Sequence, residues 1–178
     1  MDLVEEARLG NNEAFEQLIK ENKLKMYKVA KSILKNEDDI CDAIQNALMS
    51  AYSNLNKLQN NKYFSTWLIR ILINKSYDII NKNQKSYSTT TDIDEYNSDE
   101  NLKSFDSYNS ESLIENVLCE LKDDLKTITV LYYYNDYSVG DISIILNIPE
   151  GTVKSRLSRA RKKIYEIIKS EEDVLWID

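Results

Sequence analysis

Residues Ser138–Ile168 read SVGDISIILNIPEGTVKSRLSRARKKIYEII, and this stretch decides the fold. Ser138 can cap a helix, and Asp141 stands three residues later, where it completes a capping box. The pair Asn147-Ile148 ends that helix, and Pro149 has the backbone angle that the first turn of a second helix needs. Two capped helices joined by a short turn predict a helix-turn-helix.

The second helix of this stretch separates into two faces on a helical wheel. One face is apolar and is expected to pack against the preceding helices; it contains Val153, Leu157, Ala160, Ile164 and Ile168. The opposite face is polar and basic; it contains Ser155, Ser158, Arg159 and Lys162. Thr152 and Lys154 lie at the N-terminal end, the part of a recognition helix that reaches base edges in the major groove of DNA.

The chemistry of the polar face suits DNA. Small hydroxyl groups let the helix backbone approach the groove, and Arg and Lys donate hydrogen bonds to guanine or to phosphate. We therefore interpret six residues as a DNA-binding set: Thr152, Lys154, Ser155, Ser158, Arg159 and Lys162. The alternative is a solvated basic surface. Arg156, Arg161 and Lys163 flank the apolar stripe, where they can reach phosphates or neighbouring acidic side chains.

Composition narrows the class of protein. The chain has 178 residues, of which 42% are hydrophobic, with only three Gly and one Pro, so long helices are favoured over the tight turns of an all-β fold. Its formal net charge is −7, yet seven of its 23 Lys and Arg residues lie between Lys154 and Lys169. An acidic protein is repelled from DNA at long range, which predicts a protein that acts when a partner presents it to the duplex.

Catalysis, metal binding and secretion have little support. The chain contains no His, which excludes a His-dependent triad, and we expect no metal, cofactor or small-molecule substrate and no enzymatic activity. Cys41 and Cys119 stand far apart, and two free thiols in a reducing compartment are the simplest interpretation. With no apolar run near 18 residues and no signal peptide, we expect a cytoplasmic protein that does not insert into a membrane.

Helical periodicity continues through most of the chain and predicts an all-α fold. Stripes in residues 1–83 predict a compact helical domain, with caps at Asn12 or Glu13 and at Asp38 or Asp39. Residues 84–111 are polar and acidic and are expected to form a flexible linker. Residues 112–170 form a second helical domain that contains the helix-turn-helix, and 171–178 form a short acidic tail.

The segment YSVGDISIILNIPEGTVKSRLSRARKKI, residues 137–164, resembles region 4 of sigma-70-family factors of the small extracytoplasmic-function group. Within it, IPEGTVKSRLSRAR is highly specific, and the match extends upstream to roughly Ser112. The N-terminal domain resembles region 2 of the same family. DAIQNALMSAYSNL, residues 42–55, is similar to the helix that docks on the β′ clamp of RNA polymerase, although Asn46 and Leu48 replace the usual Glu and Phe.

YFSTWLIRILINKSYDII, residues 63–80, is similar to the segment that opens and contacts the −10 element. The resemblance implies that Asn74 captures a base flipped out of the duplex, and it makes Lys62, Arg70 and Lys75 candidate phosphate contacts. It implies contacts from Asp42, Gln45 and Asn46 to core polymerase. The aromatic side chains Tyr63, Phe64 and Trp67 are candidates to assist the melting of DNA. Phe64 and Trp67 can instead belong to the hydrophobic core.

The resemblance implies an alternative sigma factor that directs promoter-specific initiation. Its expected partners are core polymerase (the β′ clamp and the β flap), promoter DNA and a cognate anti-sigma factor, which is often membrane-bound and would then hold the protein at the membrane. The family's linker passes through the polymerase, so the acidic linker is either a passive tether or a strand drawn along a basic channel. The competing hypothesis is a stand-alone helix-turn-helix regulator that binds duplex DNA tightly without polymerase.

Overall fold

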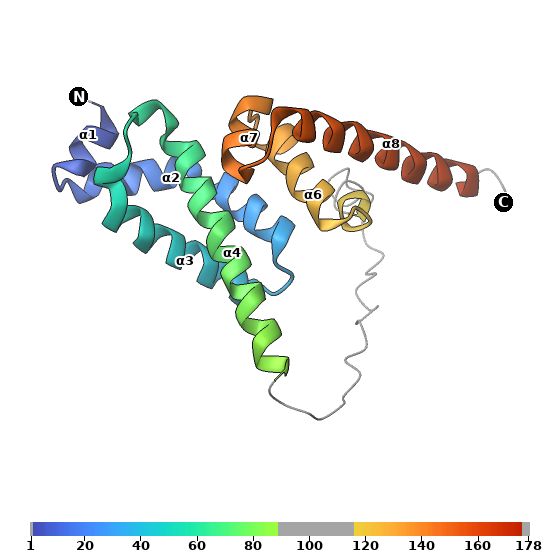
Figure 1. The fold of residues 1–178 in the computed structure, drawn as a ribbon, viewed down its shortest axis with the longest axis horizontal. Coiled ribbons are helices and arrows are strands. Elements are labelled where there is room, and N and C mark those ends of the chain that lie inside the picture. The colour runs from blue at the N-terminus through green and yellow to red at the C-terminus, as the bar shows by residue number, and fades with distance from the viewer. Residues whose placement is uncertain (1, 89–115, 176–178) are drawn as a thin grey trace.

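The computed structural model describes residues 2–88 and 116–175, and throughout these two ranges the regular structure is helical (Figure 1). The elements are α1 (Leu3–Arg8), α2 (Asn12–Ile33), α3 (Glu37–Asn54), η1 (Leu55–Lys57), η2 (Asn61–Tyr63), α4 (Phe64–Ser88), α6 (Asp123–Thr129), η3 (Val130–Tyr134), α7 (Val139–Leu146) and α8 (Glu150–Leu175). The all-α prediction is confirmed. We call α1–α4 the N-terminal unit and α6–α8, with η3, the C-terminal unit.

Asparagine side chains cap helices α2 and α3 of the N-terminal unit. The side chain of Asn11 accepts a hydrogen bond from the backbone N–H of Ala14, and that of Asn36 accepts one from Asp38. The predicted capping residues lie one to three residues after the observed ones. Asn12 and Asp38 already lie inside the helices. Each Asn has extended backbone angles and satisfies one of the unpaired N–H groups of the first turn.

Two helices differ from the predicted boundaries. The first domain was predicted to end at residue 83, whereas α4 continues to Ser88, because the polar residues there contain neither Gly nor Pro to stop a helix. Residues 171–175 of the predicted acidic tail belong to α8. The other linker residues, 89–111, lie outside the described residues.

The helix-turn-helix forms as the sequence predicts. The hydroxyl of Ser138 accepts from Asp141 N–H, and the Asp141 carboxylate accepts from Ser138 N–H in return. Asn147 ends α7 with left-handed backbone angles (φ 53°), which a short polar side chain tolerates. Ser143 Oγ then donates to the Ile148 carbonyl at 2.6 Å, and the Pro149 carbonyl accepts from Thr152 and Val153 to start α8. Side chains therefore fix both ends of the turn.

The apolar stripe of α8 is buried over its first three turns, where Val153, Leu157 and Ala160 are at most 3% exposed. Further along, the prediction of Ile168 as a core residue is wrong: it is 43% exposed, and Ile167 is buried at 4%. On the wheel these two residues flank the stripe on opposite sides at similar angles. The C-terminal unit covers only one of these sides.

The two units pack against each other, so the described residues form one body. Helix α7 lies beside α4, and α6 and η3 lie beside α2 (Figure 1). Most buried hydrophobic residues of the two units belong to one continuous cluster, which includes Leu68 and Ile69 of α4 together with Leu131 and Ile142 of the C-terminal unit. The candidate interfaces on each unit are therefore held in a defined relation to each other.

We predict that Ser138→Ala lowers the free energy of unfolding by about 0.5–2 kcal/mol, because it removes a helix cap. Urea unfolding followed by circular dichroism measures this change. Ser53→Ala is the control, since Ser53 is exposed in the last turn of α3, where Ala is a good helix former. An equal loss from both variants would contradict the role of the capping box.

Candidate nucleic-acid interface

The predicted DNA-binding set lies along one exposed face of α8. Lys154, Ser155, Ser158, Arg159 and Lys162 are exposed, and Thr152 is half-buried at the start of the helix. Ser155 Oγ donates to the Thr152 carbonyl at 3.0 Å, and Lys154 Nζ lies 3.8 Å from a carboxylate oxygen of Glu150. Within the described residues, Arg159 and Lys162 form no ion pair. Their charges are available to an external anion.

The flanking arginine Arg156 has a different position. Its Nε lies 3.5 Å from a carboxylate oxygen of Asp124 on α6, and its side chain is 28% exposed. Of the two expected roles for this residue, the structure therefore supports contact with a neighbouring acidic side chain. Arg156 joins α8 to α6, whereas Lys163 pairs on its own helix with Glu166 at 3.9 Å.

The second group of predicted residues lies on α4 and just before it. Arg70 and Asn74 are exposed one turn apart on the same face of α4, and Lys62 is exposed on η2. Lys75 points elsewhere: it is partly buried, and its Nζ lies 3.8 Å from a carboxylate oxygen of Asp78. The structure therefore brings Arg70 and Asn74 together and places Lys75 apart from them.

The aromatic residues before and within α4 divide as expected between core and surface. Phe64 is 4% exposed and packs against Trp67, with ring centroids 6.1 Å apart, whereas Tyr63 is 50% exposed. Phe64 is therefore a core residue. Tyr63 is the aromatic side chain that solvent, or a base, can reach.

The C-terminal unit approaches α4 near Arg70. Arg70 lines an open hollow of about 470 Å³ with residues at the turn of the helix-turn-helix; these are Ser143, Ile144, Asn147, Ile148 and Pro149. Two turns after Arg70, burial raises the pKa of Tyr77, and the charges of Asp123, Arg156 and Asp124 also act on it. Asn74 therefore lies between two residues that meet the C-terminal unit.

The predicted polymerase contacts form a separate surface on α3. Asp42, Gln45 and Asn46 are exposed, while the alanines on the opposite face of the helix, Ala43, Ala47 and Ala51, are fully buried. Sequence reasoning missed Met49, which lies one turn further on this exposed face and is 69% exposed. The sequence feature that could have identified Met49 is an apolar residue outside the buried stripe of the helix, three residues after Asn46.

The described residues offer little for other kinds of site. In the described part of the chain, no group of three or more His, Cys, Asp or Glu residues could hold a metal ion. No described helix is long and apolar enough to cross a membrane. Cys41 and Cys119 are free and exposed, as predicted.

Two family models match the chain, one in each of the two units. The model for sigma-70 region 2 matches residues 18–86, and that for sigma-70 region 4 matches residues 112–164. The chain therefore belongs to the sigma-70 family. It is an alternative RNA polymerase sigma factor of the extracytoplasmic-function (ECF) group within that family.

Individual relatives span nearly the whole chain. The ECF RNA polymerase sigma factor SigW of Bacillus subtilis is 29% identical over 175 residues, covering 90% of this chain and 92% of the relative. The ECF RNA polymerase sigma-E factor of Haemophilus influenzae is also 29% identical over 175 residues and covers 91% of each chain.

Solved structures share the fold. A structure of CnrH in complex with the cytosolic domain of CnrY has a TM-score of 0.69 at 21% identity, covering 94% of this chain and 96% of that one. The sigma factor RpoE of Bartonella quintana, in complex with the anti-sigma factor NepR, has a TM-score of 0.72 at 23% identity, with 87% and 96% covered.

We predict that Arg156→Ala lowers the free energy of unfolding by up to about 1 kcal/mol, the range of partly exposed ion pairs, because Asp124 loses its partner. Arg161→Ala, which changes an exposed residue of the same helix, is the control and should leave stability unchanged. Urea unfolding at low and at high salt measures both variants. If high salt does not reduce the effect of Arg156→Ala, the ion pair is not its cause.

Proposed function

We propose that this sigma factor binds core polymerase through α3, contacts the −35 element with α8 and contacts the −10 element with α4. The observation that carries the proposal is the exposed face of α8, where a helix-turn-helix presents Arg159 and Lys162 without ion pairs to other described residues. The role is one of binding and positioning, with no catalytic step of its own. Because its partners act in the cytoplasm, we place the protein there.

At the −35 element, the N-terminal half of α8 enters the major groove. Ser155 and Ser158 are small enough to let the helix approach, and Arg159 can donate two hydrogen bonds to O6 and N7 of a guanine. Lys154 and Lys162 neutralise phosphates and release condensed counterions. Thr152 stands at the end of the helix where base contacts begin.

At the −10 element, Asn74 is the proposed contact for a base removed from the stack. Its amide both donates and accepts, so it can bind the edge of an extruded base. Arg70, one turn earlier, and Lys62 lie where they can contact phosphates. Lys75 is retained as a weaker candidate, since Asp78 competes for its charge.

At the polymerase, the exposed face of α3 is the proposed docking surface on the β′ clamp. Asp42, Gln45 and Asn46 supply polar contacts around Met49, an unbranched side chain that adapts to an apolar pocket. The C-terminal unit would meet the β flap. We also propose a cognate anti-sigma factor, which is supported by the similarity in fold to a sigma factor solved with its anti-sigma factor.

Reconstituted transcription with bacterial core polymerase tests this division of labour. We expect Arg159→Ala to weaken −35 binding by about 1–3 kcal/mol, the range for a bidentate base contact. Asn74→Ala should spare −35 binding and impair promoter opening, measured by permanganate footprinting. Tight, promoter-specific duplex binding without polymerase would favour the stand-alone regulator instead.

A second variant tests the docking surface. Met49→Ala should weaken binding to core polymerase by about 1–2 kcal/mol, the range for a buried interface side chain, without changing unfolding. Competition against the wild-type protein for core polymerase measures this. Leu24→Ala is the control, since Leu24 is 65% exposed on α2, away from this surface. Equal losses of affinity for core polymerase in both variants would contradict the assignment of α3 to the interface.

A further inference from the structure

Residues 55–63 connect α3 to α4, and we call them the pre-α4 segment. Their regular structure is limited to η1 and η2, which have three residues each. Leu55 and Leu58 are buried, at 4% and 7% exposed. The exposed side chains include Lys57, Gln59, Asn60 and Lys62. Two apolar anchors leave the direction of such a polar segment weakly fixed, so other contacts must hold it.

Arg8 of α1 holds the pre-α4 segment through two hydrogen bonds. Its Nη2 donates to the Leu58 carbonyl at 2.8 Å and to Asn61 Oδ1 at 3.0 Å. Asn61 Nδ2 then donates to Asp2 Oδ2 at 2.6 Å and to Glu5 Oε2 at 3.2 Å. A charged donor or acceptor takes part in each of these bonds, which makes them stronger than neutral ones. We call Asp2, Glu5, Arg8 and Asn61 the α1 network.

Asp2 couples this network to the formation of α1 itself. Its Oδ1 accepts from the Val4 N–H at 3.3 Å and caps the helix, while its Oδ2 accepts from Asn61. Helix α1 has only six residues, which is too short for a helix to be stable by itself. The α1 helix and the pre-α4 segment therefore stabilise each other.

The α1 network lies directly before the proposed −10 contacts. Helix α4 begins at Phe64, immediately after η2, so the backbone continues from Asn61 into α4 without a break. Lys62 is exposed beside Asn61, and Tyr63 is 50% exposed. A binding residue that is held in place before its ligand arrives loses less conformational entropy on binding. Fixing Asn61 therefore favours binding through its two neighbours.

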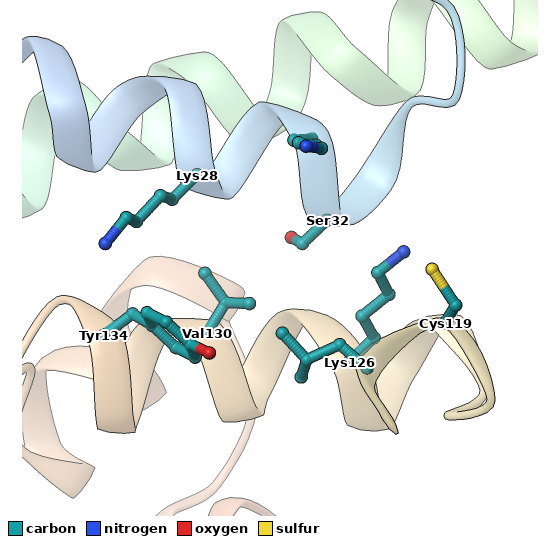
Figure 2. Close-up of a pocket in the computed structure, with 8 residues that line it drawn as sticks. Lys28, Ser32, Cys119, Lys126, Val130 and Tyr134 are labelled. Carbon is teal, nitrogen blue, oxygen red and sulfur yellow. The ribbon is translucent and has the colours of Figure 1, made fainter. Parts of the chain in front are cut away.

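The hollows beside the C-terminal unit lie away from the pre-α4 segment. One of about 140 Å³ separates α2 from that unit, and Figure 2 shows Lys28 and Ser32 on one side of it and Val130 and Tyr134 on the other. The hollow at Arg70 is lined by the turn of the helix-turn-helix. Among the described residues, the side-chain hydrogen bonds that reach the segment from other elements come from α1 and its cap.

We propose that Arg8 is a positioning residue for recognition of the −10 element. It holds the pre-α4 segment through the α1 network, and the segment presents Lys62 and Tyr63 to the non-template strand. Arg8 acts through the segment and does not contact DNA itself: its side chain is half-buried, and its Nε is buried without a hydrogen-bond partner in the described part of the chain. The inference rests on the proposed function and adds a residue from outside the predicted sites.

Arg8→Lys in the reconstituted holoenzyme tests the proposal, because it keeps the charge and removes the planar fork that bonds two acceptors together. The probe is a labelled non-template oligonucleotide with the −10 element of a promoter mapped by run-off transcription. We expect −10 affinity to fall about three- to tenfold, the equivalent of one hydrogen bond, and affinity for a −35 duplex and for core polymerase to change less than about twofold. Leu9→Ala is the control, since Leu9 is 75% exposed and lies outside the network. Unchanged −10 affinity in Arg8→Lys overturns the proposal.

A double-mutant cycle separates positioning from general support of the fold. If Arg8 acts through Lys62 and Tyr63, replacing both with Ala removes most of the effect of Arg8→Lys on −10 affinity. The combined loss is then clearly smaller than the product of the separate losses. Losses that multiply would show that Arg8 acts independently of these two side chains, which contradicts the proposed role.

Reversing one bond of the network gives a rescue test. Asn61→Asp removes the amide that donates to Asp2 and places a third carboxylate beside Asp2 and Glu5, so −10 affinity should fall. Adding Asp2→Asn restores the bond with donor and acceptor exchanged, returns the net charge to its original value and keeps a good helix cap. We expect −10 affinity to recover in this double variant. Failure to recover would contradict the role of the α1 network.

Asn74→Ala distinguishes failure of this inference from failure of the proposed function. If Asn74→Ala weakens −10 binding and Arg8→Lys does not, the assignment of α4 stands and the positioning role of Arg8 is wrong. If the wild-type holoenzyme binds the −10 oligonucleotide no better than a scrambled one, the proposed function fails and the inference fails with it.

Discussion

Helix α4 must pack on two sides at once, and the rest of the structure depends on this constraint. Leu68, Ile69, Leu72 and Ile73 are all at most 3% exposed, so α4 supplies much of the central core. Its polar face carries the exposed residues Arg70 and Asn74, and Arg70 lines a hollow with the turn of the helix-turn-helix. A helix that is both core and binding surface is held rigid on one side, which fixes the position of the side chains on the other.

Local signals predicted most of the helices. The capping box at Ser138 and Asp141 is specified within four residues, and the structure contains it as predicted. Helical periodicity does not decide between two residues that fit it equally well. Ile167 and Ile168 flank the apolar stripe of α8 at similar angles, and only Ile167, on the side that the C-terminal unit covers, is buried. The helix end at Ser88 was missed because polar residues give no periodic signal.

Contacts between the units could not be predicted, for a different physical reason. Ser65, Asn135 and Tyr137 are single polar residues whose partners lie in another part of the chain, so no spacing rule refers to them. The predicted DNA-binding residues of α8 required only the helix and its polar face, which local sequence supplies. Sequence therefore predicts surfaces on single helices better than it predicts which surfaces cover one another.

The arrangement of charge places the steps of the proposed mechanism in an order. With a net charge of −7, the free protein is repelled from DNA at long range, so the exposed basic face of α8 acts at short range. Asp42, Gln45 and Met49 are exposed, so polymerase can bind this arrangement of the two units. Polymerase then supplies the local concentration of DNA, which is why an acidic sigma factor remains specific to initiation.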